Sequence, residues 1–178
     1  KKFINLTTTW ENYNGVENNP ANLYSAYKLA FSNILKFYMK KLTNTKFYNI
    51  YLSDTFGGND SRKKLFNTLK EDYKKRKTTI LLSKNIKMNI INVKDIVSGI
   101  DALLIKNIKQ GNYSILNSSF TDVVKFLIYF NKHKKKKIKY KYNSIKMIDS
   151  KIFKYNSIPG WKPKYSKITN MIKYIEGK

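Results

Sequence analysis

The sequence predicts an α/β protein in which parallel strands are joined by helices. Short runs rich in β-branched and aromatic residues alternate with longer segments in which apolar residues recur every three or four positions. The chain has 178 residues, of which 42% are hydrophobic. That is the size of one ordinary domain with enough apolar residues for a core, which argues against general disorder.

In the first half of the chain, the predicted elements alternate between strand and helix. They cover residues 1–9, 23–42, 46–52 and 61–75. Asn22 is a suitable N-cap for the long helix, and Asn18-Asn19-Pro20 provides the turn before it. The Gly57-Gly58-Asn59-Asp60 turn ends the second strand region, and Ser61 can cap the helix that follows.

The second half continues the alternation with shorter elements. They are strands at 79–82 and 88–92, a helix at 93–108, a strand at 112–116, a helix from 119 or 121 to 130, a strand at 138–142 and a helix at 166–175. Gly111 ends the first of these helices. His133 lies in a basic stretch at the end of the second, where its charge would be mildly favourable.

The chain is strongly basic, with a formal net charge of +25 from 36 Lys+Arg and 11 Asp+Glu residues. Such a charge is typical of proteins that bind nucleic acid. However, only Arg62 and Arg76 are arginines, and Arg suits base and phosphate recognition better than Lys. The Lys content therefore favours a composition bias spread over the surface, with a Lys- and Tyr-rich nucleic-acid-binding module as the alternative.

Residues that are absent exclude several kinds of site. The sequence contains no Cys, which excludes disulfide scaffolds, thiol nucleophiles and Cys-type zinc sites. With His133 as the single histidine, we expect no metal site. No apolar run approaches the roughly 20 residues of a spanning helix, and no signal-peptide pattern opens the chain. We therefore expect a cytoplasmic protein with no membrane partner.

Tyr24 and Lys28 form a Tyr-x-x-x-Lys pair on the long predicted helix. Residues four positions apart share one face of a helix, so the ammonium can lie beside the phenol. Lowering a Tyr pKa from about 10 to about 7 takes roughly 4 kcal/mol, which a cation in a partly dry cleft can supply. Such a Tyr can act as general acid and base between an alcohol and a carbonyl.

The spacing alone is weak, because four Tyr-x-x-x-Lys pairs occur where the composition predicts about three by chance. Only the first pair lies near the start of a long helix that follows a strand ending in hydroxyl residues. Thr9 lies at the carboxyl end of that strand, where α/β ligand sites form. The context therefore singles out Thr9, Tyr24 and Lys28.

The chain resembles the extended short-chain dehydrogenase/reductase family, in which a catalytic Ser or Thr, a Tyr and a Lys occur in this order. Five segments carry the resemblance, namely FINLTTTWENY at 3–13, NLYSAYKLA at 22–30, LSDTFGGNDSRKKL at 52–65, INVKDIV at 91–97 and GWKP at 160–163. Lys94 replaces the first Asp of the family's Val-Asp-Asp-Val element. The Thr-x-Thr-Trp and Asp-Thr-Phe-Gly details are most similar to enzymes acting on CDP- or dTDP-linked deoxysugars, such as the abequose/paratose synthase branch.

The resemblance implies an NAD(P)-dependent epimerase, dehydratase or ketoreductase acting on a nucleotide-diphosphate sugar. By this resemblance, Tyr24 is the acid and base, and Lys28 both lowers its pKa and bonds the nicotinamide ribose. Leu52 would also lie against the cofactor, NAD or NADP. Thr9 would hydrogen-bond the reacting sugar oxygen, unless it merely caps a turn.

Two further residues would contact the substrate. Asp54 occupies the position of a family Asn or Asp near the sugar, although it could simply be a turn former. Arg62 is a candidate diphosphate ligand, because its fork suits two phosphate oxygens, although it could be a surface charge.

The resemblance also implies a Rossmann-like doubly wound parallel sheet with a small α/β substrate-binding region. Residues 1–75 would be the C-terminal half of the Rossmann-like domain, including the catalytic helix. Residues 76–178 would mostly form the substrate-binding region, with some segments returning to the Rossmann core. A homodimer through the catalytic helix is a further implication.

The family's Gly-rich βαβ unit, with its G-x-x-G-x-x-G loop, is absent, since the seven glycines have no such spacing. We therefore expect this chain to be the C-terminal part of such an enzyme. Alone, it should be inactive and should not bind NAD(H) or NADP(H) tightly. A split or decayed gene product with a scaffolding role is the other interpretation.

Overall fold

The computed structural model describes residues 1–144, 147–149, 151 and 153–178, and it contains a four-stranded parallel sheet. In spatial order, its strands are β1 (Lys2–Thr8), β2 (Lys46–Leu52), β7 (Gly111–Ile115) and β11 (Asn156–Ser157). β1 and β2 pair in register along their whole length, so both end at the same edge of the sheet. The parallel sheet confirms the predicted α/β class.

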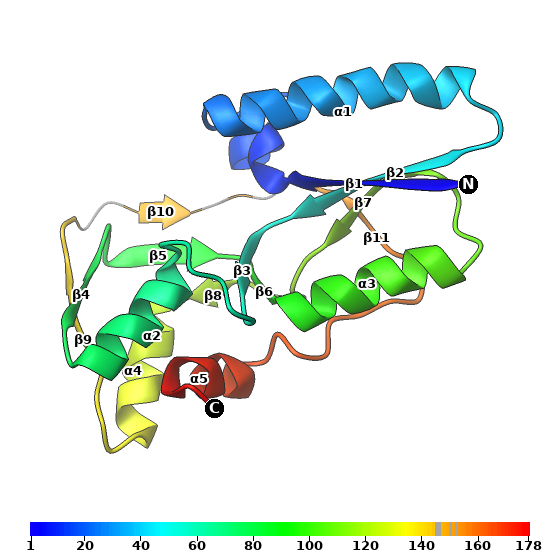
Figure 1. Ribbon diagram of the computed structural model, residues 1–178. Helices are drawn as coiled ribbons and strands as arrows, with labels where there is room; N and C mark the ends of the chain where they lie inside the picture. The colour runs from blue at the N-terminus through cyan, green and yellow to red at the C-terminus, as the bar shows by residue number, and fades with distance from the viewer. Residues whose placement is uncertain (145–146, 150, 152) are drawn as a thin grey trace.

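Helices cover both faces of this sheet (Figure 1). α1 (Leu23–Lys41) lies over one face and α3 (Val93–Ile105) over the other. The face toward α3 is apolar, and Ile50 and Ile115 are fully buried there. Burial of this face and of the facing side of α3 holds the helix against the sheet.

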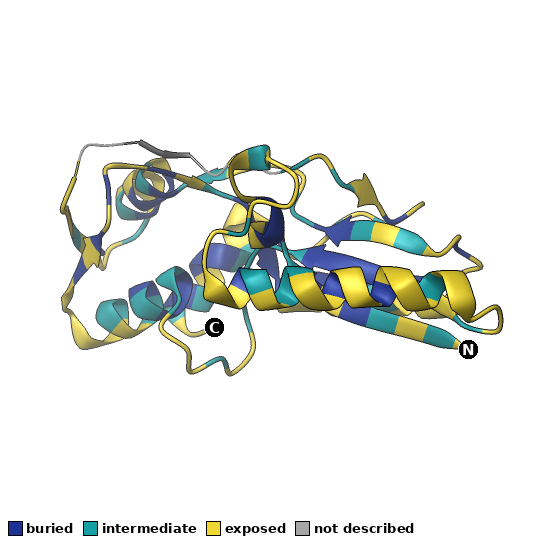
Figure 2. Ribbon diagram, turned by 90° about the horizontal axis from the view of Figure 1, so that it is seen from above, coloured by how far each residue is buried: buried dark blue, intermediate teal, exposed yellow. Residues whose placement is uncertain are grey.

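The face toward α1 is mixed, because the buried aromatic residues Phe47 and Tyr51 lie on either side of the amide of Asn49 on β2. Asn5 donates a side-chain hydrogen bond to Asn49 at 3.0 Å, and Asn49 donates to Asn112 at 3.2 Å, so a row of amides crosses three strands. Buried amides need such partners, and this row provides them. The outer side of α1 is largely exposed (Figure 2).

The remaining elements form a second group beside the sheet (Figure 1). Its helices are α2 (Leu65–Lys75), α4 (Val123–His133) and α5 (Ile168–Glu176). Its short strands form three small sheets in the described part of the chain. β3 (Asp54–Phe56) pairs with β6 (Ile90–Asn92), and β4 (Thr78–Leu81) pairs with β9 (Lys139–Tyr142). β5 (Asn85–Met88) lies between β10 (Met147–Asp149) and β8 (Thr121–Asp122). All of these pairings are parallel except that of β5 with β8.

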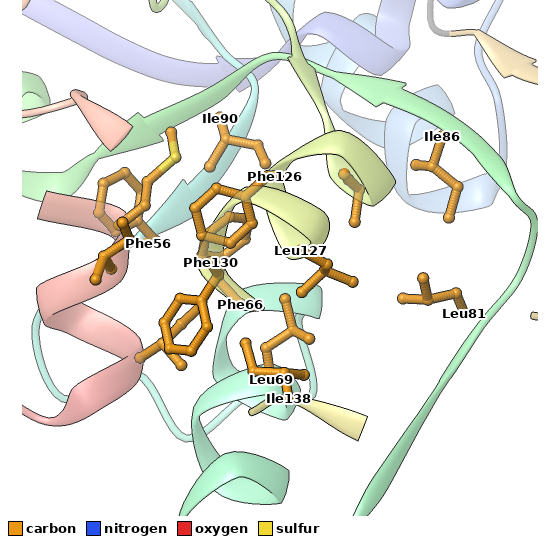
Figure 3. Packing of buried hydrophobic residues seen from close by; sticks show 14 residues of the cluster. Phe56, Phe66, Leu69, Leu81, Ile86, Ile90, Phe126, Leu127, Phe130 and Ile138 are labelled. Carbon is orange, nitrogen blue, oxygen red and sulfur yellow. The ribbon is translucent and has the colours of Figure 1, made fainter. Parts of the chain in front are cut away.

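An aromatic core holds this second group together (Figure 3). Phe66 lies 5.5 Å from Phe126 between ring centroids, and 5.6 Å from Phe56. Phe130 and Leu127 of α4 are fully buried in the same cluster. Such tilted ring pairs add to the stabilisation that burial of their area provides.

No single position in the sequence separates the residues of one apolar core from those of the other. α2 precedes residue 75 and joins the second core, whereas α3 and β7 follow it and pack on the four-stranded sheet. The division at residue 75 stays a prediction. In the described part of the chain, every helix is too short or too polar to cross a membrane.

α2 begins later than the sequence predicts. It starts at Leu65, and Ser61 does not cap it. The reason is Asn67, whose side-chain amide donates to the carbonyl oxygens of Asp60 at 2.8 Å and Arg62 at 2.9 Å. These bonds hold the preceding residues in a loop.

The ends of α3 and α4 lie closer to their predicted positions. α3 ends at Ile105, three residues earlier than predicted. α4 begins at Val123, because the Asp122 side chain accepts a hydrogen bond from the backbone N–H of Lys125 at 3.0 Å. It ends at His133, three residues after the predicted end at residue 130, so the single histidine does lie at the helix C-terminus.

Candidate active site

A cleft of about 700 Å³ opens where the carboxyl ends of β1 and β2 meet the loop between β3 and α2. The first residues of α1 and α3 form its other walls. Five of the six residues singled out from the sequence line it, namely Tyr24, Lys28, Leu52, Asp54 and Arg62. Ligand sites of open α/β sheets form at such carboxyl ends, so this cleft is the candidate active site.

Tyr24 and Lys28 reach the cleft from the first turns of α1. The helix starts here because Asn22 and Ser25 form a capping box, in which each side chain accepts a hydrogen bond from the other's backbone N–H at 3.0 Å. Lys28 Nζ donates to the carbonyl oxygen of Leu6 at 3.0 Å, which holds the ammonium at the end of β1. Tyr24 is 57% exposed, so its phenol is accessible to a ligand.

The three hydroxyl residues at the end of β1 take different positions. Thr8 lines the cleft, and its Oγ1 accepts a hydrogen bond from the Trp10 N–H at 3.3 Å. Thr7 also lines the cleft, but it is largely buried and its hydroxyl donates to the Glu11 carboxylate. Thr9, the residue chosen from the sequence, is buried, and the wall that the described residues form includes Thr8 in its place. Thr8 is therefore a second candidate for the hydroxyl beside a ligand.

Glu11 is a buried carboxyl behind the cleft that the sequence analysis did not find. One oxygen accepts hydrogen bonds from Thr7 and, at 3.2 Å, from Ser32 of α1, while the other has no partner among the described residues. Burial raises the pKa of Glu11, and the two hydrogen bonds and the charges of Lys36 and Lys28 oppose that rise. Glu11 thus connects β1 to the helix of the Tyr-Lys pair. A single Glu in a polar turn carries no sequence signal for this role.

Asp54 and Leu52 flank the link between β2 and β3. Asp54 faces the cleft, where burial raises the pKa of its carboxyl and the charge of Lys64 partly offsets that rise. Leu52 ends β2 and, with Leu6, gives the cleft an apolar wall beside Lys28. The site therefore combines an apolar surface with groups that can hold charge.

Arg62 is paired with Asp60 at the rim. Nε and a terminal nitrogen of Arg62 each donate to one oxygen of the Asp60 carboxylate at 2.8 Å, and the Arg62 backbone N–H adds a third bond at 3.1 Å. Lys64 Nζ lies 3.7 Å from the same carboxylate. These hydrogen bonds and charges hold the pKa of Asp60 well below its usual range.

Comparison with solved structures finds similar folds in enzymes named for sugar nucleotides. UDP-glucose 4-epimerase of Thermus thermophilus, solved with NAD, has a TM-score of 0.78 at 14% identity, with 99% of this chain and 63% of that chain covered. The dTDP-glucose 4,6-dehydratase of Bacillus anthracis, solved with NAD, gives 0.77 at 19% identity, with 98% and 60% covered. UDP-glucuronic acid 4-epimerase of Bacillus cereus, solved with UDP-glucuronic acid and NAD, gives 0.74 at 14%, with 99% and 62% covered.

The chain has the fold of the C-terminal part of these enzymes. It spans about 60% of their length. No protein-family model matches the sequence, and no curated protein matches it either. The fold that the resemblance implied is confirmed, although identities of 14–19% leave the activity to be tested.

Proposed function

We propose that this chain is the catalytic and substrate-binding part of an NAD(P)-dependent enzyme that acts on nucleotide-diphosphate sugars. One observation carries the proposal, namely that Tyr24 and Lys28 reach the same cleft as Asp54 and Arg62. Two solved proteins of this fold hold NAD together with UDP-linked sugars or sugar acids in their structures. Epimerase, dehydratase and ketoreductase chemistry all fit this set of residues.

The residues of the cleft suit the nicotinamide end of the cofactor. Leu6 and Leu52 offer an apolar surface to a flat ring, and Lys28 uses one of its N–H groups on the Leu6 carbonyl, which leaves two for ribose hydroxyls. When bound, nicotinamide supplies or accepts a hydride. Lys28 and Tyr24 would then hold the ribose.

Tyr24 would move the proton that accompanies this step. Its phenol donates to a sugar carbonyl oxygen when an alcohol forms and accepts the proton when a carbonyl forms. The Lys28 ammonium, one helical turn away on the same side of α1, would lie beside the ligand that Tyr24 contacts. The hydroxyl of Thr9 or Thr8 would hydrogen-bond the same sugar oxygen and stabilise the charge that develops on it.

The cofactor's pyrophosphate would be bound by polypeptide outside these 178 residues. The sequence contains no G-x-x-G-x-x-G loop. Among the described residues, β1 forms one edge of the sheet and pairs with β2 alone, so its other side offers main-chain groups to a further parallel strand. Phe3 on β1 is 41% exposed, which gives such a segment an apolar side chain to cover.

Replacing Tyr24 by Phe tests the proposal. In the native protein that carries this chain, Tyr24→Phe should abolish turnover, followed by chromatography of the nucleotide-sugar products, and should leave the melting temperature unchanged because Tyr24 is exposed. Tyr27→Phe is the matched control, since Tyr27 lies on the same helix and is 68% exposed. Full activity of the Tyr24 variant would refute its role.

The 178 residues alone provide a second test. Calorimetry with NAD(H) and NADP(H) should detect no binding in the low-micromolar range. Low-micromolar binding would show that the cofactor site is complete without a glycine-rich loop.

We also propose that the exposed side of α1 packs against the same helix of a second copy. Tyr27, Phe31, Ile34 and Tyr38 are 43–68% exposed and follow one another three or four positions apart, so they form one apolar stripe. Light scattering should give a dimer for the wild-type chain and a monomer for Phe31→Glu. A monomeric wild type would refute the dimer without affecting the cleft.

A further inference from the structure

The Arg62 fork, which is the most exposed cation of the cleft rim, is already occupied in the structure. Its Nε and one terminal nitrogen, which form one edge of the guanidinium, donate to the two oxygens of one carboxylate, that of Asp60, with two bonds of 2.8 Å. The Arg62 side chain is 71% exposed, so this pair contributes little to folding stability. The pair therefore has another consequence, which concerns what Arg62 can bind.

The donors around Asp60 form the set that a phosphate group would need. The Arg62 fork and the Arg62 backbone N–H converge on the carboxylate, and Lys64 Nζ lies 3.7 Å from it. Arg forks bind carboxylate and phosphate oxygens with the same two-bond geometry. Asp60 thus occupies the place of an anionic ligand.

The loop can release this carboxylate without unfolding. Asn67, which is 5% exposed, donates to the backbone carbonyls of Asp60 and Arg62, so the backbone is held independently of the side-chain pair. Rotation of the Asp60 side chain breaks only the bonds to Arg62 and Lys64. The neighbouring Thr55 hydroxyl, which accepts a hydrogen bond from Lys64 Nζ at 2.6 Å, keeps that ammonium at the cleft.

We propose that Asp60 is an internal competitor for phosphate, which the diphosphate of the ligand must displace from Arg62 and Lys64. The displacement favours ligands that bring two adjacent phosphates over those that bring one, since a single phosphate gains little more than Asp60 already provides. Asp60 is therefore a specificity-determining residue that raises selectivity at the expense of affinity. This inference rests on the proposed diphosphate-binding role of the cleft.

Calorimetric titration of the chain with inorganic pyrophosphate and with inorganic phosphate tests the proposal. Asp60→Asn keeps an oxygen that can accept the Arg62 backbone bond but removes the competing charge, so pyrophosphate should bind about five- to tenfold more tightly. The preference for pyrophosphate over phosphate should become smaller. In Asp60→Asn combined with Arg62→Gln, the gain should disappear.

Glu71→Gln is the matched control for net charge, because Glu71 is an exposed residue of α2 whose ion-pair partner among the described residues is Lys75 at 3.6 Å. It should bind pyrophosphate as the wild type does. The proposal would be overturned if Asp60→Asn melts at the wild-type temperature but binds pyrophosphate no more tightly than the wild type. It would also be overturned if Glu71→Gln gains as much affinity for pyrophosphate as Asp60→Asn does. Neither probe contains sugar or nicotinamide, so a gain by Asp60→Asn in a protein without turnover would support this inference and refute only the enzymatic proposal.

Discussion

Asp95 is a fully buried carboxylate that connects the start of α3 to the segment before α5, and its replacement by Ala should be severely destabilising. Its oxygens accept hydrogen bonds from the backbone N–H groups of Lys164 at 2.7 Å and Tyr165 at 3.0 Å, and from the Ser166 hydroxyl at 2.5 Å. Residues on either side of Asp95 line the cleft, so these bonds also fix one of its walls.

The magnitude follows from what happens to each partner. A hydrogen bond to a charged group contributes about 1.5–3 kcal/mol. Asp95→Ala leaves the backbone N–H groups of Lys164 and Tyr165 and the buried Ser166 hydroxyl without this acceptor. We therefore expect Asp95→Ala to lower the free energy of unfolding by about 3–4 kcal/mol, which is a large part of the roughly 5–15 kcal/mol typical of a domain.

Urea unfolding followed by circular dichroism measures this loss, and the melting temperature should fall by about 10 °C. Asp101→Ala is the control, because Asp101 is an exposed residue of the same helix and should change stability by less than about 0.5 kcal/mol. A loss below about 1 kcal/mol for Asp95→Ala, or an equal loss for Asp101→Ala, would refute the reasoning.

Two further variants test the packing behind the site. Burial raises the pKa of Glu11 above its usual 4.5, so the native state binds the Glu11 proton more tightly than the unfolded state does. The stability that this proton contributes is present below pH 4.5 and is lost as the pH rises from 4.5 through the native pKa of Glu11. Glu11→Gln should not lose this stability, so the difference in urea midpoint between the variant and the wild type should shift in favour of the variant between pH 4 and pH 8. If this difference is the same at every pH, the burial argument is wrong. Gly99→Ala would place a Cβ 2.7 Å from Cδ1 of Ile115 and should lower the free energy of unfolding by about 1–3 kcal/mol. Adding Ile115→Val, which removes that Cδ1 atom, should recover part of the loss, and a double variant with purely additive losses would show that the contact is not the cause.

Much of the fold could be predicted because its signals are local. The period of apolar residues located α1 and β2, and Asn22 marked the first residue before α1 correctly, since a cap depends only on residues three positions away. The spacing of Tyr24 and Lys28 placed both on one side of a helix for the same reason. The start of α2 was wrong because Asn67 holds the preceding loop, and no periodicity reports such a bond.

The sequence by itself therefore determined the order of the five α-helices and of the longer strands, and the residues of the Tyr-Lys pair, whereas the short strands β3, β8, β10 and β11 were not predicted. Only the tertiary structure decided that Thr8 faces the cleft, that Glu11 is buried between β1 and α1, and that the Asp95 carboxylate receives its hydrogen bonds from residues some 70 positions later in the chain. These facts depend on which distant segments pack together, and that choice is made by the burial of whole faces of helices and sheets, which no short stretch of sequence encodes.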